Sequence, residues 1–385
     1  MTALVVGLLL AAAPESAAKP VDYAGDAQAL DQLIRENYAY VERWPDRVLP
    51  DSPRLRAERE AVKDDNALLR YAEHRIASLA DHHAITGPSF RTSWALVPTY
   101  ADLWIVEDGG AYRIDAVRAD SPAAKAGIVP GDRLLSVGGV AIDRAVADYW
   151  AALGLSPVGD RKANAARVLA AGRRDRPRQL EIGSGGTTRS LTLPNLYSIE
   201  TPARAPVDVV AGPDGRVTIR VNNALGDDAT IAAFDQAMAR VPRTARLTID
   251  LTDTPSGGNT TIARAIMGWF TPRLANYQVH ILQAEERRSG IVRRWVEQVA
   301  PRPGKRFAGR PTVVVGRWTG SMGEGLAIGL KALGAHVCGG PMAGLLGAID
   351  DFRLPSSGMT VKFPAERLEA VWGQPREAFA PPPCA

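Results

Sequence analysis

Strand-like and helix-like patterns alternate along the chain from Val207 to its end, and this alternation most constrains the fold. The expected strands are 216–221, 247–251, 312–316 and 335–338, and the expected helices are 230–240, 260–270 and 323–333. Such alternation predicts an α/β core with a mainly parallel sheet and helices on its faces. Loops at the carboxyl ends of such strands carry ligands and catalytic groups, which directs attention to segments 252–259 and 317–322.

Two other regions precede this core in the 385-residue chain. Between Asp26 and Ala80, apolar residues recur at helical spacing with no strand between them, so 19–95 is predicted as a helical region. Short β-patterned runs separated by turns then predict a β-rich domain over 96–195, and the α/β core follows over 205–385.

The N-terminus carries an eleven-residue apolar run over 3–13, followed by the small residues of Ser16-Ala17-Ala18. This run is shorter than the roughly 20 residues that a membrane span needs. We therefore interpret 1–18 as a signal peptide, although the usual positive charge before the run is missing. The expected mature chain has no integral membrane span and is periplasmic or extracellular.

Composition excludes several classes of function. Lys and Arg number 46 against 42 Asp and Glu, so the net charge of +4 does not call for a nucleic-acid partner. The dense basic cluster at 173–178 has no aromatic residue interleaved and is predicted to be a solvated loop. Five histidines and two cysteines without metal-ligand spacing predict neither a metal site nor a cofactor.

Within the β-rich region, residues 126–135 read Ala-Gly-Ile-Val-Pro-Gly-Asp-Arg-Leu-Leu after a short capped helix. This segment resembles a PDZ domain of the kind found in bacterial proteases. A PDZ domain binds an extended peptide at a sheet edge. The usual Gly-Leu-Gly-Phe carboxylate loop is absent, however, with Trp104-Ile105-Val106 in its place, so peptide binding and a purely structural role both remain open.

The loop at 317–322 runs from a buried-type strand into a helix and places Ser321 at the helix N-terminus. Unpaired N–H groups there stabilise a developing oxyanion, with the Met322 N–H as the natural donor. An N-capping serine explains the same position, and from this loop alone is the better interpretation, because Thr-x-Ser-x-Gly is not the Gly-x-Ser-x-Gly elbow.

The loop at 252–259 also joins a strand to a helix and contains Gly257-Gly258. Paired glycines let the backbone approach a ligand closely, which suits a second oxyanion donor at Gly257 or Gly258. An ordinary turn explains them equally well. A phosphate-binding loop is excluded because the Gly-Lys-Ser/Thr ending is missing.

Together the two loops resemble those of the carboxyl-terminal processing peptidase and tricorn-core family of serine peptidases. The resemblance covers an Asp-Leu-x-x-x-Pro-x-Gly-Gly type strand loop, then about sixty residues later a strand and Thr-x-Ser-x-x-Glu. It extends over nearly the whole mature chain and implies a crotonase-like α/β core with an inserted PDZ-like domain. Two departures are Thr252, where the family usually has arginine, and one extra residue before Gly257.

The resemblance also implies a general base for Ser321. The processing branch uses a lysine about two dozen residues after the serine, but 339–347 contains none. The tricorn-like branch uses a histidine in a string such as Asp-Gly-His-Thr, which aligns with His83 in Asp81-His82-His83. His82 is the main rival, and Asp81 is either a supporting partner or a helix cap.

A third group must hold the tautomer of the imidazole. The tricorn-like branch uses a carboxylate near the C-terminus, which corresponds to Glu377, while a solvated surface glutamate is the alternative. Glu324, one helical turn after Ser321, is the other candidate orienter or a helix cap.

The sequence therefore predicts an exported serine peptidase that cleaves a protein or peptide substrate through an acyl-enzyme. The competing hypothesis, motivated by the missing lysine and arginine, is a non-catalytic peptide- or small-ligand-binding protein on the same scaffold. An esterase using the same triad is a third hypothesis. The sequence leaves the oligomeric state open.

Overall fold

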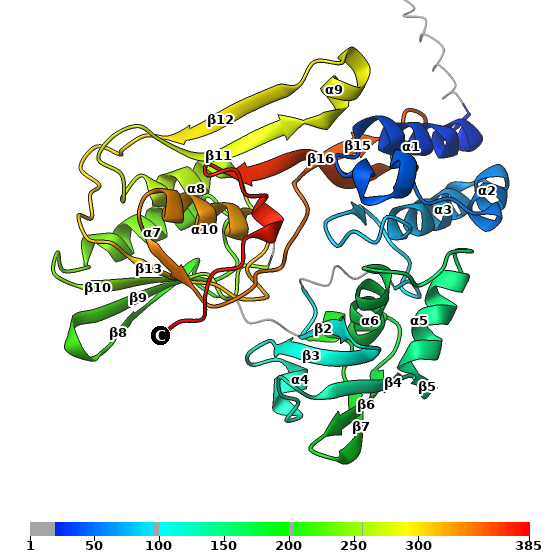
Figure 1. Cartoon of the computed structure of the whole chain (residues 1–385), viewed down its shortest axis with the longest axis horizontal. Coiled ribbons are helices and arrows are strands. Elements are labelled where there is room, and N and C mark those ends of the chain that lie inside the picture. The colour runs from blue at the N-terminus through cyan, green and yellow to red at the C-terminus, as the bar shows by residue number, and fades with distance from the viewer. Residues whose placement is uncertain (1–19, 95–99, 200–203, 256) are drawn as a thin grey trace, which may run out of the picture.

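The computed structural model describes residues 20–94, 100–199, 204–255 and 257–385. The signal-peptide prediction for 1–18 lies outside these residues. Three groups of elements follow each other along the chain: a helical region, a β-rich domain below it and a larger core beside both (Figure 1). Among the described residues, no helix is long and apolar enough to span a bilayer.

The helical region comprises α1 (Tyr23–Asn37), α2 (Pro53–Glu60) and α3 (Asp65–Ala77). Each begins at a residue whose side chain accepts a hydrogen bond from the first turn: Asp22, Ser52 and Asp64. Their apolar faces share a core with Val361 and Phe363 from the C-terminal part of the chain. The helical region is therefore packed directly onto the core.

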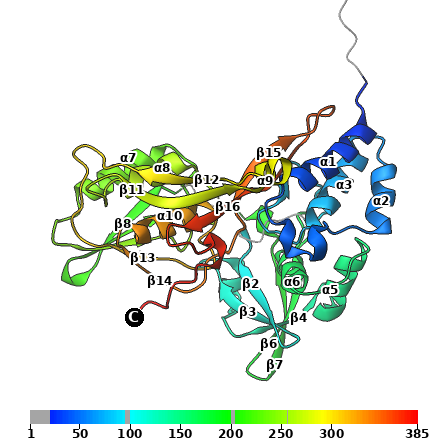
Figure 2. The same ribbon diagram turned by 45° about the horizontal axis from the view of Figure 1, so that its top comes forward.

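The β-rich domain is a six-stranded antiparallel sheet covered by helices (Figure 2). Its strands are β2 (Leu103–Asp108), β3 (Ala111–Val117), β4 (Arg133–Val137), β5 (Val140–Ala141), β6 (Arg178–Ser184) and β7 (Thr187–Leu193). Its helices are α4 (Pro122–Lys125), α5 (Ile142–Ala151) and α6 (Arg161–Ala171). It has its own apolar core, which includes Ile105, Ile114 and Trp150.

The prediction of a solvated basic loop at 173–178 is wrong for its last residue, Arg178, which begins β6. Arg178 is only 3% exposed and pairs with Asp102, with nitrogen–oxygen distances of 2.6 and 2.8 Å. A buried guanidinium needs such a partner because an isolated charge is costly to desolvate. Charge density alone did not distinguish this arginine from its exposed neighbours.

The core contains two sheets with helices between them (Figure 1). In the first sheet, β9 (Arg216–Val221), β10 (Arg246–Asp250), β13 (Thr312–Val314) and β14 (His336–Cys338) pair in parallel. Strand β8 (Val207–Ala211) is antiparallel at its edge. The helices are α7 (Ala229–Ala239), α8 (Thr260–Met267) and α10 (Met322–Ala332).

The second sheet of the core is antiparallel. It comprises β1 (Ile85–Thr86), β11 (Ala275–Leu282), β12 (Arg293–Val299), β15 (Ala348–Arg353) and β16 (Thr360–Ala370), with α9 (Gln283–Ser289) between β11 and β12. Short connections make neighbouring strands antiparallel, as in the β11–β12 and β15–β16 hairpins. In the described residues parallel pairing is confined to the first sheet, so the prediction of a mainly parallel core is wrong for the core as a whole.

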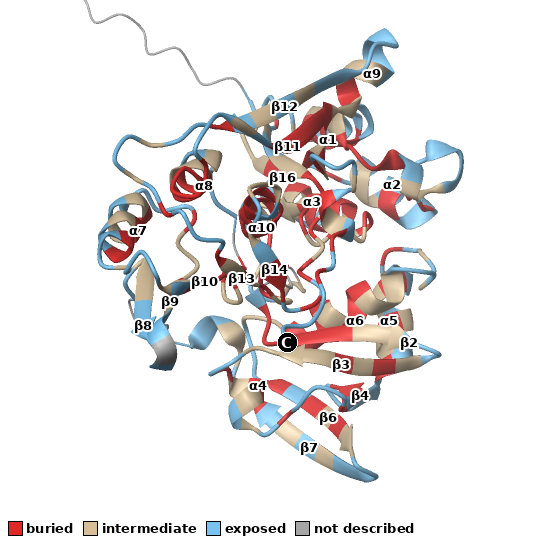
Figure 3. Ribbon diagram, turned by 60° about the vertical axis from the view of Figure 1, so that its left-hand side comes forward, coloured by how far each residue is buried: buried red, intermediate tan, exposed pale blue. Residues whose placement is uncertain are grey.

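The apolar residues of α8 and α10 are buried between the two core sheets, with Ile249, Val313 and Tyr277 among their neighbours (Figure 3). Nine of the eleven residues of α10, Met322 to Leu330, are buried. The residue immediately before α10 is therefore held by a helix that is packed on all sides.

Candidate active site

The site forms where the loop before α10 meets the turn after α3. Ser321 Oγ lies 3.0 Å from His83 Nε2, although 238 residues separate them in the sequence. His83 is buried and Ser321 partly exposed, so the serine is the member of the pair that a ligand can reach. Of the two adjacent histidines, the structure places His83 at the serine.

The tautomer of His83 follows from its second hydrogen bond. Its Nδ1 atom lies 2.7 Å from the carbonyl oxygen of Leu346, which can only accept. In the neutral ring Nδ1 therefore carries the proton, and Nε2 accepts from the Ser321 hydroxyl. Burial and the nearby Arg376 guanidinium lower the pKa of His83 to about 4. The backbone carbonyls of Leu346 and Gly347 act in the opposite direction but are outweighed. The ring is thus neutral at neutral pH, as a general base must be.

Ser321 has an unusual backbone, with φ of 52° and ψ of −114°. Positive φ is uncommon for residues with a Cβ atom and often accompanies function. The conformation directs the hydroxyl to His83 while the backbone N–H donates to Glu324 Oε2 at 2.9 Å. The interpretation of Ser321 as only a helix cap does not account for its contact with His83.

Glu324 is fully buried and fixes the loop opposite the serine. Its carboxylate also accepts from the backbone N–H groups of Gly344, at 2.8 Å, and Leu345, at 3.2 Å. Burial raises the pKa of Glu324 to about 7, although Arg376 and the three backbone donors lower it. Glu324 thereby links Ser321 to the segment whose next residue, Leu346, holds His83.

The glycine loop lies beside Ser321. Thr254 and Thr319 form a parallel bridge, with Thr254 N–H donating to the Trp318 carbonyl at 2.9 Å and Gly320 N–H to the Thr254 carbonyl at 3.0 Å. A Cβ atom added to Gly257 would lie 3.5 Å from Ser321 Oγ. The structure thus brings Gly257 next to the predicted nucleophile.

Gly258 and Met322 occupy different surroundings. A Cβ atom at Gly258 would lie 2.3 Å from the Leu225 carbonyl oxygen, so Gly258 allows two backbone segments to approach. Met322 is the first residue of α10, where the N–H has no partner inside the helix. Gly257 and Met322 therefore flank Ser321 from the two loops.

Asp81 and His82 support the turn that carries His83. Asp81 accepts from the His83 backbone N–H at 2.8 Å and from the Tyr38 hydroxyl at 2.8 Å. The His82 ring turns away from the serine and lies against α6, 3.1 Å from the Asn164 side-chain nitrogen. The tandem histidines thus face two different domains.

Glu377 does not contact His83 through any hydrogen bond among the described residues. Glu377 lies near Tyr40 and Asp81. Burial raises the pKa of the Tyr40 hydroxyl and of the Asp81 carboxyl, and the charge of Glu377 raises both pKa values further. Its neighbour Arg376 is buried and donates to the carbonyls of Leu345, at 2.9 Å, and Gly347, at 2.7 Å. The sequence pointed to the C-terminal segment that contains Arg376, but it predicted a role neither for Arg376 nor for the Leu346 carbonyl. A backbone acceptor such as this carbonyl leaves no mark in a sequence.

Known proteins resemble this chain in one part of its sequence and in its fold. Residues 113–163 match the family model described as a PDZ domain. A solved photosystem II D1 C-terminal processing protease has a TM-score of 0.57 and 17% identity, covering 94% of this chain and 92% of that chain. Mature CPAF has a TM-score of 0.59 and 14% identity, with the same coverage. No curated protein is significantly similar to the sequence.

The chain has the fold of the carboxyl-terminal processing peptidases. The resemblance predicted from the two loops is confirmed at this level, and so is the PDZ domain.

In this processing-peptidase fold, the PDZ domain is joined tightly to the loop that carries Ser321. Trp318 Nε1 donates to the Ala101 carbonyl at 2.7 Å, and Trp318 packs against Trp104 in a small apolar cluster. Arg317 pairs with Asp115 at 2.7 Å. Trp104, which stands where the carboxylate loop was expected, is only 1% exposed and bridges two domains.

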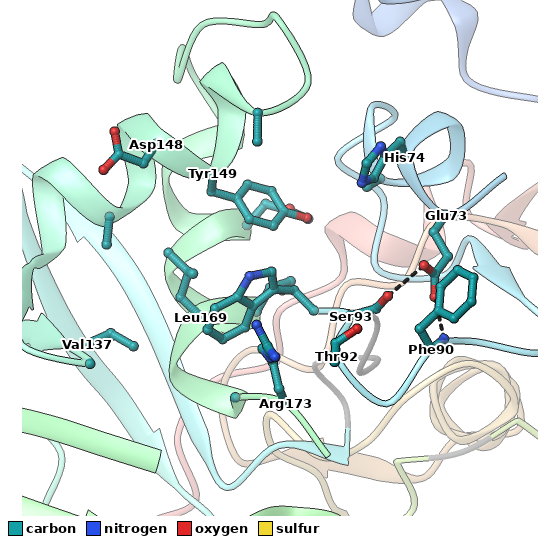
Figure 4. A pocket seen from close by; sticks show the side chains of 18 of the residues that line it. Glu73, His74, Phe90, Thr92, Ser93, Val137, Asp148, Tyr149, Leu169 and Arg173 are labelled. Carbon is teal, nitrogen blue, oxygen red and sulfur yellow. Dashed lines mark hydrogen bonds between the residues drawn. The ribbon is translucent and has the colours of Figure 1, made fainter. Parts of the chain in front are cut away.

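Two large cavities lie next to the segments that carry Ser321 and His83, although neither is lined by these two residues. One, of about 1190 Å³, lies between the PDZ domain and the loops at 252–253 and 316–318 and is lined by Asp253, Arg317 and Trp318 among others. The other, of about 740 Å³, lies between α3 and the PDZ helices. In it Tyr149 and His74 lie across from each other, while Glu73 accepts from Ser93 Oγ at 2.6 Å (Figure 4).

Within the described residues, no group of three or more His, Cys, Asp or Glu side chains is arranged to hold a metal ion. Both cysteines are used structurally: Cys338 at the end of β14 forms a disulfide with Cys384 in the C-terminal tail. The Gly339 N–H also donates to the Pro382 carbonyl at 2.8 Å. The disulfide and this hydrogen bond thus hold the C-terminal tail at the end of β14, which pairs with β13.

Proposed function

We propose that the chain is an exported serine peptidase in which Ser321 is the nucleophile and His83 the general base. The observation that carries the proposal is the 3.0 Å contact between Ser321 Oγ and His83 Nε2, with the tautomer of His83 set by the Leu346 carbonyl. A non-catalytic binder on this scaffold has no need for this pairing or for the positive φ of Ser321.

Catalysis proceeds through an acyl-enzyme. As Ser321 Oγ forms a bond with the scissile carbonyl carbon, its proton passes to His83 Nε2. The same proton is then given to the leaving nitrogen as the carbon–nitrogen bond breaks. Water attacks the ester in the second half-reaction, again losing a proton to His83, and the acyl product leaves with Ser321 restored.

The oxyanion of each tetrahedral intermediate is bound by backbone N–H groups. Met322 N–H at the start of α10 and Gly257 N–H beside Ser321 are the proposed donors, while Gly258 serves the close approach to Leu225. Gly257→Ala is expected to lower turnover without disturbing the fold, because its Cβ atom would occupy space beside Ser321 at an ordinary contact distance of 3.5 Å, whereas Gly258→Ala is expected to destabilise the protein.

In place of a catalytic carboxylate at Nδ1, the Leu346 carbonyl orients His83. Arg376 and Glu324 are positioning residues, because they hold the 344–347 segment from its two sides. Glu377 is a supporting residue of this region. It reaches His83 only through its neighbours Asp81 and Tyr40.

The substrate is proposed to be an unfolded protein or peptide. The cavity between the PDZ domain and the catalytic loops is large enough for an extended chain and opens beside Trp318, three residues before Ser321. Export is supported by the Cys338–Cys384 disulfide, since disulfides persist in oxidising compartments, and by the apolar run at 3–13.

A fluorophosphonate probe tests the proposal. Folded protein should form a covalent adduct that mass mapping places on Ser321, and a disordered protein such as casein should be cleaved. Ser321→Ala should abolish both signals while its thermal unfolding stays close to wild type. A wild-type protein that is folded yet neither labelled nor active would favour the binding hypothesis, and turnover of esters without peptides would favour an esterase.

A further inference from the structure

The hairpin formed by β11 and β12, which contributes no residue to the candidate active site, carries an unusual combination of side chains at its tip. Strand β11 runs outward, α9 makes the turn and β12 returns (Figure 1). The segment 287–296 reads Arg-Arg-Ser-Gly-Ile-Val-Arg-Arg-Trp-Val and contains no acidic residue. We call residues 287–294 the hairpin tip.

The apolar side chains of the hairpin tip face solvent. Ile291 is 70% exposed and Val292 53% exposed. They follow Gly290, whose φ of 73° makes the turn that ends α9. Single exposed aliphatic residues are ordinary, but two adjacent ones at the apex of a turn form a small exposed apolar patch.

Four arginines surround that point, and their guanidinium groups stay charged whether or not they are paired. Arg287 donates to the neutral Glu36 carbonyl at 2.7 Å, and Arg288 makes no ion pair within the described part of the chain. Arg293 and Arg294 have acidic partners at 3.3 and 2.7 Å, in Glu285 and Glu369, but both remain exposed.

A neighbouring loop adds to the same face. Burial lowers the pKa of Arg287 and so does the nearby Arg47, while Glu286 acts in the opposite direction. Val48, which follows Arg47, is 64% exposed. Near the tip, five arginines (Arg47, Arg287, Arg288, Arg293 and Arg294) stand against three acidic residues (Glu285, Glu286 and Glu369), so a positive excess remains that attracts an anionic surface.

We propose that the hairpin tip is a peripheral binding site for an anionic lipid bilayer. The arginines bind phosphate headgroups while Ile291 and Val292 enter the boundary between headgroups and acyl chains. A bilayer fits better than a folded protein partner because arginines surround exposed aliphatic residues at the turn of a hairpin, which suits phosphate headgroups and the acyl-chain boundary together. A single-stranded nucleic acid is disfavoured because the one aromatic residue of 287–296, Trp295, is already stacked on His280.

Vesicle flotation of the full chain tests this site. Wild type is expected to float with vesicles of phosphatidylcholine mixed with phosphatidylglycerol, more weakly at high salt, and to stay unbound with phosphatidylcholine alone. Arg288→Glu and the pair Ile291→Ser with Val292→Ser should each weaken binding by about tenfold. The pair Val209→Ser with Val210→Ser is the matched control, because these exposed β8 valines lie at the opposite end of the core.

Three results would overturn the proposal. Wild type could fail to bind anionic vesicles, or the control pair could weaken binding as much as the tip variants. Alternatively, light scattering could show that wild type is an oligomer that the tip variants convert to a monomer, with no vesicle binding, and the tip would then be an interface between copies. Matching thermal unfolding and Ser321 labelling in all variants would show that each remains folded.

Discussion

Two buried histidines, His83 in the candidate active site and His280 in the antiparallel sheet, have opposite acid–base properties. The pKa of His83 is lowered to about 4 by burial and Arg376. Burial also lowers the pKa of His280, but Glu297 at 3.1 Å and Glu366 at 2.7 Å outweigh it and raise the pKa to about 9. The atoms at the ring nitrogens decide the outcome: a carbonyl and a hydroxyl leave His83 neutral, whereas carboxylates make His280 a cation.

The comparison predicts that only one of the two histidines matters for chemistry. His83→Ala should lower the rate of acylation by about 10⁴-fold or more, because Ser321 loses its base. His280→Gln should leave the same rate within a factor of a few. Stopped-flow acylation by an activated ester checks both, and equal losses in the two variants would contradict the assignment.

A second contrast separates the two glutamates proposed to orient the site. Glu324→Gln should lower kcat/KM by about 10- to 100-fold, because at least one of three buried backbone N–H groups loses its charged acceptor. Glu377→Gln, which has no direct bond to His83, should cost only a few-fold. A larger loss for Glu377→Gln would restore the carboxylate predicted from the sequence as the orienting group.

The free energy of unfolding should depend on pH through both histidines, through His280 at alkaline pH and through His83 at acid pH. His280 has a folded pKa above its unfolded value near 6.5, so its contribution is fully present below pH 6.5 and lost as the pH rises to about 9. His280→Gln should remove this alkaline loss, which is of order 2 kcal/mol. Urea unfolding from pH 6 to 10 measures it.

His83 should act on the acid side. Its pKa is depressed on folding, so the unfolded chain binds a proton first, and stability falls as the pH drops from about 6.5 to about 4. His83→Gln should flatten that limb in urea unfolding between pH 4 and 7. An unchanged acid limb in this variant would show that His83 is not held neutral by the fold.

The smallest expected effect concerns the PDZ domain. Asn164 on α6 holds the ring of His82, next to the base. Asn164→Ala should lower kcat/KM about threefold, the cost of one neutral hydrogen bond acting through His82. Lys162→Ala on the same helix, which pairs with Glu107 inside the domain, is the control. Identical kinetics for the two variants would remove any link through His82.

The sequence predicted the helices and strands around the candidate active site well because their patterns are local. The loop before α10, the Gly257 loop and His83 were all expected at the site. The antiparallel β11–β12 hairpin was missed, since pairing between strands depends on contacts that no short pattern encodes. The partner of His83 Nδ1 was not predicted either, because the Leu346 backbone carbonyl carries no side-chain signature.

The pH dependence of Ser321 labelling tests the central claim, that a neutral, carbonyl-oriented His83 activates the serine, most directly. Second-order rate constants for fluorophosphonate labelling, measured from pH 3 to pH 8 on protein shown to be folded throughout, should stay level down to about pH 5. They should then fall with a midpoint near the His83 pKa of about 4. A midpoint near 6.5 or above, or labelling that persists in His83→Ala, would contradict the account.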